Sequence, residues 1–486
     1  MLLSQGRKVW TVAAFLALAA VVATASLLAP HELLVIPTVA LLLTLVTFAG
    51  LRASAWQGLT FAALLGFVVL SYGFANWVIR LFGVPLPVGH MIAGAALVLS
   101  LPGHGRELKA MLHSPITRAW LLMIVFALGH LGFDLPRYGA YAVRDASFVL
   151  EGVFLTLGFI SARGGYEIRL FLRMMAVLFA VNLIYALTFP FQEAIREASP
   201  VSGIFLSVPL LGSYTHTALF LLVGSLFFLL LGKRATGWPL PVVVIIAAAQ
   251  AGWSLVLQVR SMYLGMALSV LLLVLLGGVR SGGLRKAVIV IAAACLLVFS
   301  VDFFGIELRG RVGRVDAEFL LSHVRSLLLQ PGTPGLGTVK WRLDLLPELW
   351  ARWTRGITNV LVGEGFGEPL IDYVGLGSVV IRAPHNTHIT VAMRLGLVGL
   401  AIWVFVHASI VALLFGGLRR YRSDEALKSL YLWLFLSYLL SMLFTSVEPW
   451  LEFSFGAVPF FTLVGFVMGL ADADEIHEAM RFEEPR

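Results

Sequence analysis

Two histidines stand three residues apart in the segment 384–388 (PHNTH), directly before a helical pattern that runs into an apolar stretch. Asn386 is a good helix N-cap, and Pro384 punctuates the start of the helix. His385 would then lie at the positive end of a helix, which disfavours imidazolium and keeps the ring able to accept a proton as a general base. A histidine that only caps the helix is the structural alternative. His385 and His388 have a spacing that could hold a metal, but no acidic or cysteine partner is near, so we expect no metal.

An arginine on an apolar helix face is the second candidate. At 100° per residue, one stripe is formed by Leu346, Leu349, Trp350, Trp353 and Ile357. Arg342 falls on this stripe, and an arginine aimed at protein or bilayer should have an anionic partner. Arg352 and Arg355 fall on the opposite face, where Glu348 is spaced for an i,i+4 pair with Arg352. This pattern predicts a solvated face for Arg352 and Arg355.

Two further features lie close to apolar runs. Arg260 occupies the very short turn between two such runs, in the sequence QVRS. It either extends to lipid headgroups or lines an outer cavity, where its fork of donors suits phosphate. Residues 363–367 (GEGFG) carry glycine at alternate positions, which permits a tight turn or a nest of amides for an anion. A structural turn is the favoured interpretation.

The elements that position these residues must be membrane helices. The chain has 486 residues, 59% hydrophobic and 13% charged, with mean hydropathy +0.92, whereas about a quarter of a soluble chain is charged. A span needs about 20 apolar residues. The candidate spans are 10–29, 33–51, 57–80, 86–102, 116–135, 143–162, 168–190, 212–231, 238–258, 262–278, 285–304, 396–416, 428–446 and 455–471. We therefore expect an all-α polytopic transmembrane bundle of 12–14 spans.

The basic residues predict the topology. With the N-terminus inside, most lysines and arginines of the short turns fall on the cytoplasmic side, so N-in and C-in is expected. The chain then divides into spans over 1–301, a large periplasmic loop with amphipathic helices over 302–395, C-terminal spans over 396–471 and an acidic cytoplasmic tail over 472–486. The net charge of +8 reflects topology and predicts no nucleic-acid partner. Ten basic residues in the loop indicate either anionic lipid headgroups or an anionic substrate.

These residues together resemble a known family. His385 and Asn386 followed by residues 396–399 (GLVG) resemble the signature of the O-antigen ligase and polymerase family of bacterial surface polysaccharide enzymes. Arg260 before a Leu-rich span, Arg342 upstream, and the 363–367 turn resemble the family's order of elements over about residues 255–415. The twelve spans typical of ligases are fewer than the fourteen counted here.

The resemblance implies a metal-independent, cofactor-free inverting glycosyltransferase in the bacterial inner membrane. It would move a glycan from an undecaprenyl diphosphate donor to a sugar hydroxyl at the periplasmic face, as an O-antigen ligase that joins O-antigen to lipid A-core in lipopolysaccharide biosynthesis. Arg260 and Arg342 would bind the diphosphate and His385 would act on the acceptor hydroxyl. The possible supporting residues are Asn386, His388, Arg382 and Gly365.

Two other functions remain open, and a purely structural membrane protein is a third and weaker alternative. An O-antigen or exopolysaccharide polymerase shares this chemistry and differs in its acceptor. A lipid-linked glycan flippase or other transporter should carry ionisable groups within its spans, and the best candidates are Arg144, Asp145 and Glu151. Glu151 lies deepest, where it would pair with Arg144 or line a cavity.

Overall fold

The computed structural model describes residues 54–81, 84–163, 165–205, 207–277, 336–371, 373–374 and 380–471, and short pieces between 285 and 325. These residues form an all-α bundle with three two-stranded antiparallel hairpins. The expected spans 10–29 and 33–51, most of 285–304 and the acidic tail lie outside the described residues.

The expected polytopic bundle is confirmed. Among the described residues, six helices are long and apolar enough to cross a membrane: α3 with η2 and α4 (Ala55–Ala75), α7 (Pro115–Tyr138), α10 (Gly165–Leu187), α12 with η5 and α13 (Thr217–Thr236), α20 (Thr387–Arg420) and α21 (Glu425–Thr445). Four shorter apolar helices match further expected spans: α5 (Val88–Ser100), α14 (Leu240–Val256), α15 (Arg260–Gly277) and α22 (Ser454–Ala471).

Short elements connect the spans. They are β1 (Val78–Leu81), β2 (Val84–Pro87), α6 (Gly105–His113), α8 (Ala140–Leu150), η3 (Glu151–Phe154), α9 (Leu155–Ser161), η4 (Phe189–Phe191), α11 (Gln192–Ala198), β3 (Val201–Ser202), β4 (Val208–Pro209), α18 (Leu336–Trp353), α19 (Ile357–Val362), β5 (Tyr373–Val374), β6 (Val380–Ile381) and η6 (Trp450–Glu452). β1 pairs with β2 in the register Val78 to Pro87, and β5 pairs with β6 in the register Tyr373 to Ile381.

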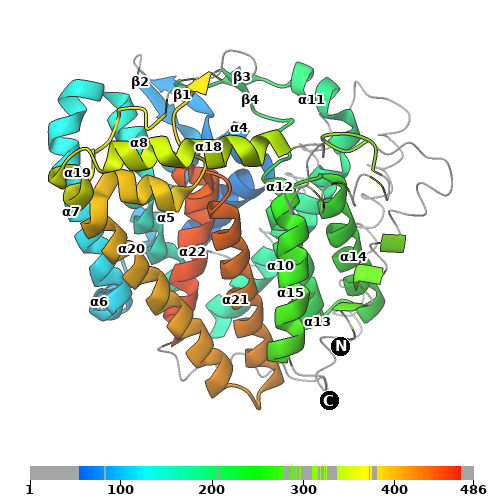
Figure 1. The fold of residues 1–486 in the computed structure, drawn as a ribbon. Helices are drawn as coiled ribbons and strands as arrows, with labels where there is room; N and C mark the ends of the chain where they lie inside the picture. Colours follow the sequence, from blue (N-terminus) through cyan, green and yellow to red (C-terminus); the bar gives the residue numbers. More distant parts are fainter. Residues whose placement is uncertain are drawn as a thin grey trace.

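The two ends of the bundle differ in the elements that they carry (Figure 1). At one end α18 lies across the bundle near the hairpins β1–β2 and β3–β4, and we call this the α18 end. At the opposite end lie α6, α13 and the turn that joins α20 to α21. Basic residues of those three elements, such as Arg106, Lys233 and Arg420, therefore gather at the end away from α18, which is the arrangement that the charge pattern requires.

The expected span 143–162 is not one helix. α8 stops at Leu150, and the 3-10 turn η3 places Glu151 in the interior, where its Oε1 lies 2.8 Å from His90 Nε2 and accepts from Ser454 Oγ at 2.5 Å. Arg144 instead lies over the ring of Phe205, 5.4 Å from its centroid. The expected Glu151–Arg144 pair is therefore wrong, because the break in the helix rotates the two side chains apart.

The last part of the expected periplasmic loop is helical. α20 begins at Thr387, and the boundary expected at residue 396 falls at a kink inside it, where Gly396 has φ 61° and ψ −162°. A Cβ at Gly396 would lie 2.4 Å from the backbone carbon of Leu361 in α19. Glycine is required there because this φ strains other residues and because the two backbones nearly touch. The kink thus lets α19 pack directly on α20.

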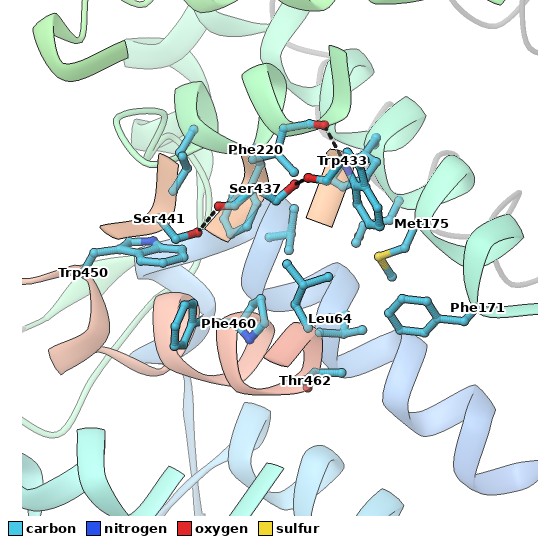
Figure 2. Close-up of a pocket in the computed structure, with 17 residues that line it drawn as sticks. Leu64, Phe171, Met175, Phe220, Trp433, Ser437, Ser441, Trp450, Phe460 and Thr462 are labelled. Atoms are coloured by element: carbon cyan, nitrogen blue, oxygen red, sulfur yellow. Dashed lines mark hydrogen bonds between the residues drawn. The ribbon is translucent and has the colours of Figure 1, made fainter. Parts of the chain in front are cut away.

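The bundle interior contains a cavity of about 50 Å³ (Figure 2). Its lining includes Leu64, Phe171, Phe220, Trp433, Trp450 and Phe460. Ser437 and Ser441 also line it, but each hydroxyl donates to a backbone oxygen of its own helix, at 2.7 and 2.8 Å (dashed in Figure 2). One water occupies about 30 Å³ of liquid, and ligand pockets usually exceed about 300 Å³. This cavity is a packing void and not a substrate site.

Candidate functional site

His385 lies in the loop before α20, with φ 55° in the left-handed region that residues other than glycine rarely adopt. Its Nδ1 is 3.7 Å from Glu448 Oε2, and its ring meets that of Trp341 edge-on at 5.7 Å. Asn386 fixes this arrangement: its Oδ1 accepts from the Ile389 amide at 3.1 Å, and its Nδ2 donates to Ser446 O at 2.9 Å. The expected N-cap is confirmed, and it also ties the start of α20 to the loop that bears Glu448.

The imidazole of His385 is neutral near pH 7. Burial, followed by the positive charge of Arg342, lowers the pKa of His385 to about 4. A neutral ring was expected from the field at the helix start, and the main physical cause is instead loss of water around the ring. A neutral imidazole is the protonation state that a proton acceptor needs.

Arg342 extends from α18 to the same place. Its Nη2 lies 3.6 Å from Glu448 Oε1, while its buried Nε has no hydrogen-bond partner among the described residues. Burial raises the pKa of the Glu448 carboxyl, and the charges of Arg342 and Arg311 oppose that rise. Arg342 therefore has the anionic partner that its position on an apolar face predicted, but the contact is long and leaves guanidinium donors available to a ligand.

The packed face of α18 differs slightly from the expected stripe. Leu349 is buried, and Trp341, Leu345 and Trp353 pack around the same small cluster with Leu370, Ile371 and Met393. Leu346, Trp350 and Ile357 are exposed. α18 lies across the end of the bundle (Figure 1), and the expected stripe runs past its end, because Ile357 is the first residue of α19.

The expected solvated face is wrong for Arg352. Its Nε donates to Glu364 Oε2 at 2.8 Å, its Nη2 lies 2.7 Å from the same oxygen, and its Nη1 donates to the carbonyls of Pro369 and Leu370. Its side chain is 17% exposed. Arg352 therefore ties α18 to residues 364–370, whereas Arg355 is exposed as expected.

The glycine turn 363–367 is structural. Gly363, Gly365 and Gly367 all have positive φ. Its amides are already occupied by carboxylates of the protein: Phe366 N donates to Asp134 Oδ2 at 2.7 Å, and Gly367 N donates to Asp145 Oδ2 at 3.1 Å. The alternative of an open anion nest is thereby excluded.

Arg382 and Arg394 reinforce this turn. Arg394 Nη2 lies 2.7 Å from Asp145 Oδ2 and its Nη1 donates to Gly365 O at 3.0 Å, while Arg382 Nη2 donates to Gly367 O at 2.5 Å. Gly365 and Arg382, expected as supporting residues, thus make their contacts within the turn and not with His385. The structure assigns them to the scaffold beneath α18 and α19.

His388 also points elsewhere. Its Nδ1 accepts from Trp403 Nε1 at 3.0 Å, and its ring lies 6.4 Å from that of His407 inside the bundle. It does not share a partner with His385. Among the described residues, no group of three or more His, Cys, Asp and Glu could hold a metal ion.

Arg260 is the first residue of α15. It lies close enough to Arg342 and Arg311 for their positive charges to act on its guanidinium. The structure therefore brings the three residues expected to do chemistry to one place. Two that the sequence did not single out lie with them, Arg311 and Glu448. We call these five residues the arginine–histidine cluster: Arg260, Arg311, Arg342, His385 and Glu448.

A second imidazole faces the cluster. His216 lies directly before α12, with its Nδ1 3.4 Å from Ser71 Oγ. Burial, then the charges of Arg311 and His385, lower the pKa of His216 to about 3, so this ring is neutral too. No spacing or motif distinguishes His216 in the sequence, because its place depends on the packing of distant helices.

The charge of the cluster defines what it can bind. The five residues of the cluster carry a formal charge of +2, because they include three guanidinium groups and one carboxylate and the imidazole of His385 is neutral, as is that of His216. Like charges held this close repel each other unless an anion joins them. The arrangement can bind a multiply charged anion next to a group that accepts a proton.

Comparisons with other proteins add no family to this geometry. No protein-family model matches the sequence, and no curated protein sequence matches it.

Proposed function

We propose that this chain is a metal-independent glycosyltransferase that moves a glycan from undecaprenyl diphosphate to a sugar hydroxyl. In this proposal the α18 end faces the periplasm, and the enzyme acts as an O-antigen ligase with lipid A-core as the acceptor. The observation that carries it is the neutral His385, which lies 3.7 Å from Glu448 and beside Arg342, in one cluster with Arg260 and Arg311. The resemblance over residues 255–415 supplies the donor and acceptor classes.

The cluster suits a displacement at an anomeric carbon. The acceptor oxygen forms a bond to the anomeric carbon, the bond from that carbon to the diphosphate oxygen breaks, and the electron pair leaves with the diphosphate. Arg260 and Arg342 stabilise the charge on this leaving group, and such stabilisation is usually the largest catalytic contribution. Attack on the face opposite the diphosphate inverts the anomeric configuration.

His385 and Glu448 take the proton. The neutral ring accepts the proton of the acceptor hydroxyl as the new bond forms. The carboxylate of Glu448, 3.7 Å from His385 Nδ1, then stabilises the imidazolium, as the acidic member of a catalytic triad does for its histidine. The ring of Trp341, 5.7 Å away and nearly perpendicular, also packs against the imidazole.

A polymerase that extends the carrier-linked glycan would use the same cluster. Deletion in the parent bacterium distinguishes the two: loss of a ligase leaves long carrier-linked chains unattached, whereas loss of a polymerase leaves single units. A transporter is less well supported, because its candidate groups have internal partners. Asp145 is paired with Arg394, and Glu151 is bonded to His90 and Ser454.

Single alanine replacements test the site. In membranes of cells that express the full chain, we expect His385→Ala, Arg260→Ala and Arg342→Ala each to lower glycan transfer at least about tenfold. Arg355→Ala is the matched control, since Arg355 is exposed in the turn that directly follows α18, the helix that bears Arg342. Near-normal transfer in all three variants would overturn the site.

A further inference from the structure

The side chain of Gln258 holds the turn that carries Arg311. Its Oε1 accepts from the amides of Val312 at 2.6 Å and Gly313 at 3.1 Å, and its Nε2 donates to Gly313 O at 3.0 Å. The turn closes on itself through Gly310 N to Gly313 O, 2.8 Å, and through the bridge from Arg309 to Arg314. One buried amide therefore fixes the backbone that directly follows Arg311.

The fit of Gln258 to this turn is tight. Gln258 is 1% exposed and has φ 54°, a left-handed backbone that needs support from its surroundings. A Cβ at Gly310 would lie 2.3 Å from the Gln258 side-chain amide carbon. The Gln258 side chain therefore fits against the turn only because residue 310 is glycine. Its three hydrogen bonds offset the backbone strain at Gln258.

Gln258 connects the positions of two arginines, Arg311 and Arg260. Gln258 lies two residues before Arg260, the first residue of α15, so the residue that holds the turn of Arg311 is also close to Arg260 in the chain. The positive charge of Arg311 acts on the guanidinium of Arg260 and on the carboxylate of Glu448. Arg311 is exposed and has no ion-pair partner among the described residues. The carboxylate of Glu448 attracts Arg311 without forming an ion pair, so this exposed guanidinium is available to an anionic ligand beside Arg260.

We propose that Arg311 is a third arginine of the anion site and that Gln258 is the positioning residue that holds it there. The ligand is a diphosphate diester, whose two negative charges match the formal +2 of the cluster. Three forked guanidiniums suit two linked phosphates better than a single one. This inference rests on the proposed function, since it names the part of the donor that Arg311 binds.

The test measures binding of inorganic pyrophosphate to the purified full chain in nanodiscs of uncharged lipid, by calorimetry. We expect Arg311→Ala and Gln258→Met each to raise the Kd about tenfold, the effect of one lost charge-assisted contact. Methionine keeps the length of glutamine but makes none of its three hydrogen bonds. Gly310→Ala, which pushes the turn off Gln258, gives the same loss if Gln258→Met does not fold. Arg355→Ala binds as the unaltered chain does.

The double variant distinguishes positioning from general weakening. If Gln258 acts through Arg311, Gln258→Met adds nothing to the loss in Arg311→Ala, whereas a merely structural role gives losses that multiply. Multiplied losses, an unchanged Kd in Arg311→Ala, or no pyrophosphate binding by the unaltered chain each overturn the inference. Loss of binding in nanodiscs with phosphatidylglycerol would assign the arginines to lipid headgroups and overturn it too.

Glycan transfer in the same preparations separates this inference from the proposed function. Normal binding and transfer in Arg311→Ala, with transfer lost in His385→Ala, would remove Arg311 and leave the function standing. Pyrophosphate binding that depends on Arg311, in a chain that transfers no glycan, would keep the anion site and remove the glycosyltransferase.

Discussion

His385 Nδ1 and the carboxylate of Glu448 lie 3.7 Å apart, although one precedes α20 and the other follows α21. The second oxygen of Glu448 lies 3.6 Å from Arg342, so one carboxylate joins the candidate base to the candidate anion site. Both contacts are longer than a hydrogen bond of ordinary length, about 2.9 Å. The distance between His385 and Glu448 suits an imidazole that is neutral at rest and becomes positively charged only when it accepts a proton.

Glu448→Gln keeps the shape of the side chain and removes its charge. We expect kcat for glycan transfer to fall about tenfold to a hundredfold, because the imidazolium of His385 loses its counter-charge. The Kd for pyrophosphate should fall, since Arg342 and Arg311 lose a competing anion. Steady-state kinetics and calorimetry measure the two effects. An unchanged kcat, or weaker pyrophosphate binding, would contradict this role of Glu448.

The pH profile of transfer follows from the low pKa of His385. The ring is neutral above its pKa of about 4, so kcat/KM should stay level near neutral pH and fall as the pH drops through about 4. In Arg342→Ala the charge that helps to lower the pKa is absent, and the acid limb should move to higher pH. Rates over a pH series measure the limb. A limb that stays in place in Arg342→Ala would show that Arg342 does not act on the ring.

The same shift predicts a dependence of stability on pH. The unfolded chain binds a proton at His385 near the ordinary pKa of 6.5, whereas the folded chain binds it only near 4. The contribution of His385 to stability is therefore present above pH 6.5 and is lost as the pH falls from 6.5 toward 4. His385→Gln should flatten this part of a plot of melting temperature against pH. Curves of equal slope for both chains would count against it.

Arg352→Ala should destabilise the α18 end without acting on the chemistry. It leaves the Glu364 carboxylate, 9% exposed, without its partner, which costs about 3 kcal/mol for a buried pair. The melting temperature should fall, while pyrophosphate binding per folded molecule stays unchanged. Arg355→Ala, exposed in the turn directly after α18, should melt at the same temperature as the unaltered chain. Equal melting of the two variants would contradict the structural role.

Gly396→Ala tests how α20 supports the cluster. The added Cβ would lie 2.4 Å from the Leu361 backbone, at a φ that strains alanine, so we expect a loss of at least about 2 kcal/mol and weaker transfer. Gly416→Ala is the matched control on the same helix, because nothing lies within 4 Å of its Cβ position. Thermal unfolding and transfer assays compare them. Similar behaviour of both variants would show that the kink is not needed.

The spans and three cluster residues were predictable because each rests on a local pattern. Apolar runs of about 20 residues identify membrane helices directly. Arg260, Arg342 and His385 stood out because no local structural role explained them. Arg352 shows the limit of such patterns. The i,i+4 rule favours Glu348 as its partner. The actual partner, Glu364, lies beyond the end of the helix, where helical periodicity predicts nothing.

The other members of the cluster depend on packing between distant segments. Glu448 reaches His385 only because Asn386 ties the start of α20 to Ser446. Arg311 was one of ten basic residues in the loop, and the buried contacts of Gln258 are what set it apart. Arg382 lies three residues before His385, yet its guanidinium binds Gly367 O and lies over the ring of Tyr141, and Gly365 O accepts from Arg394.

The most direct test of the central claim compares His385→Gln with the unaltered chain, purified in nanodiscs. Transfer from an undecaprenyl-diphosphate-linked glycan to a sugar-hydroxyl acceptor is measured alongside pyrophosphate binding. In the proposed mechanism His385 acts on the acceptor proton and the arginines on the diphosphate, so we expect kcat to fall about 10²- to 10⁴-fold while the Kd for pyrophosphate is unchanged. A variant that transfers at the rate of the unaltered chain would contradict the claim.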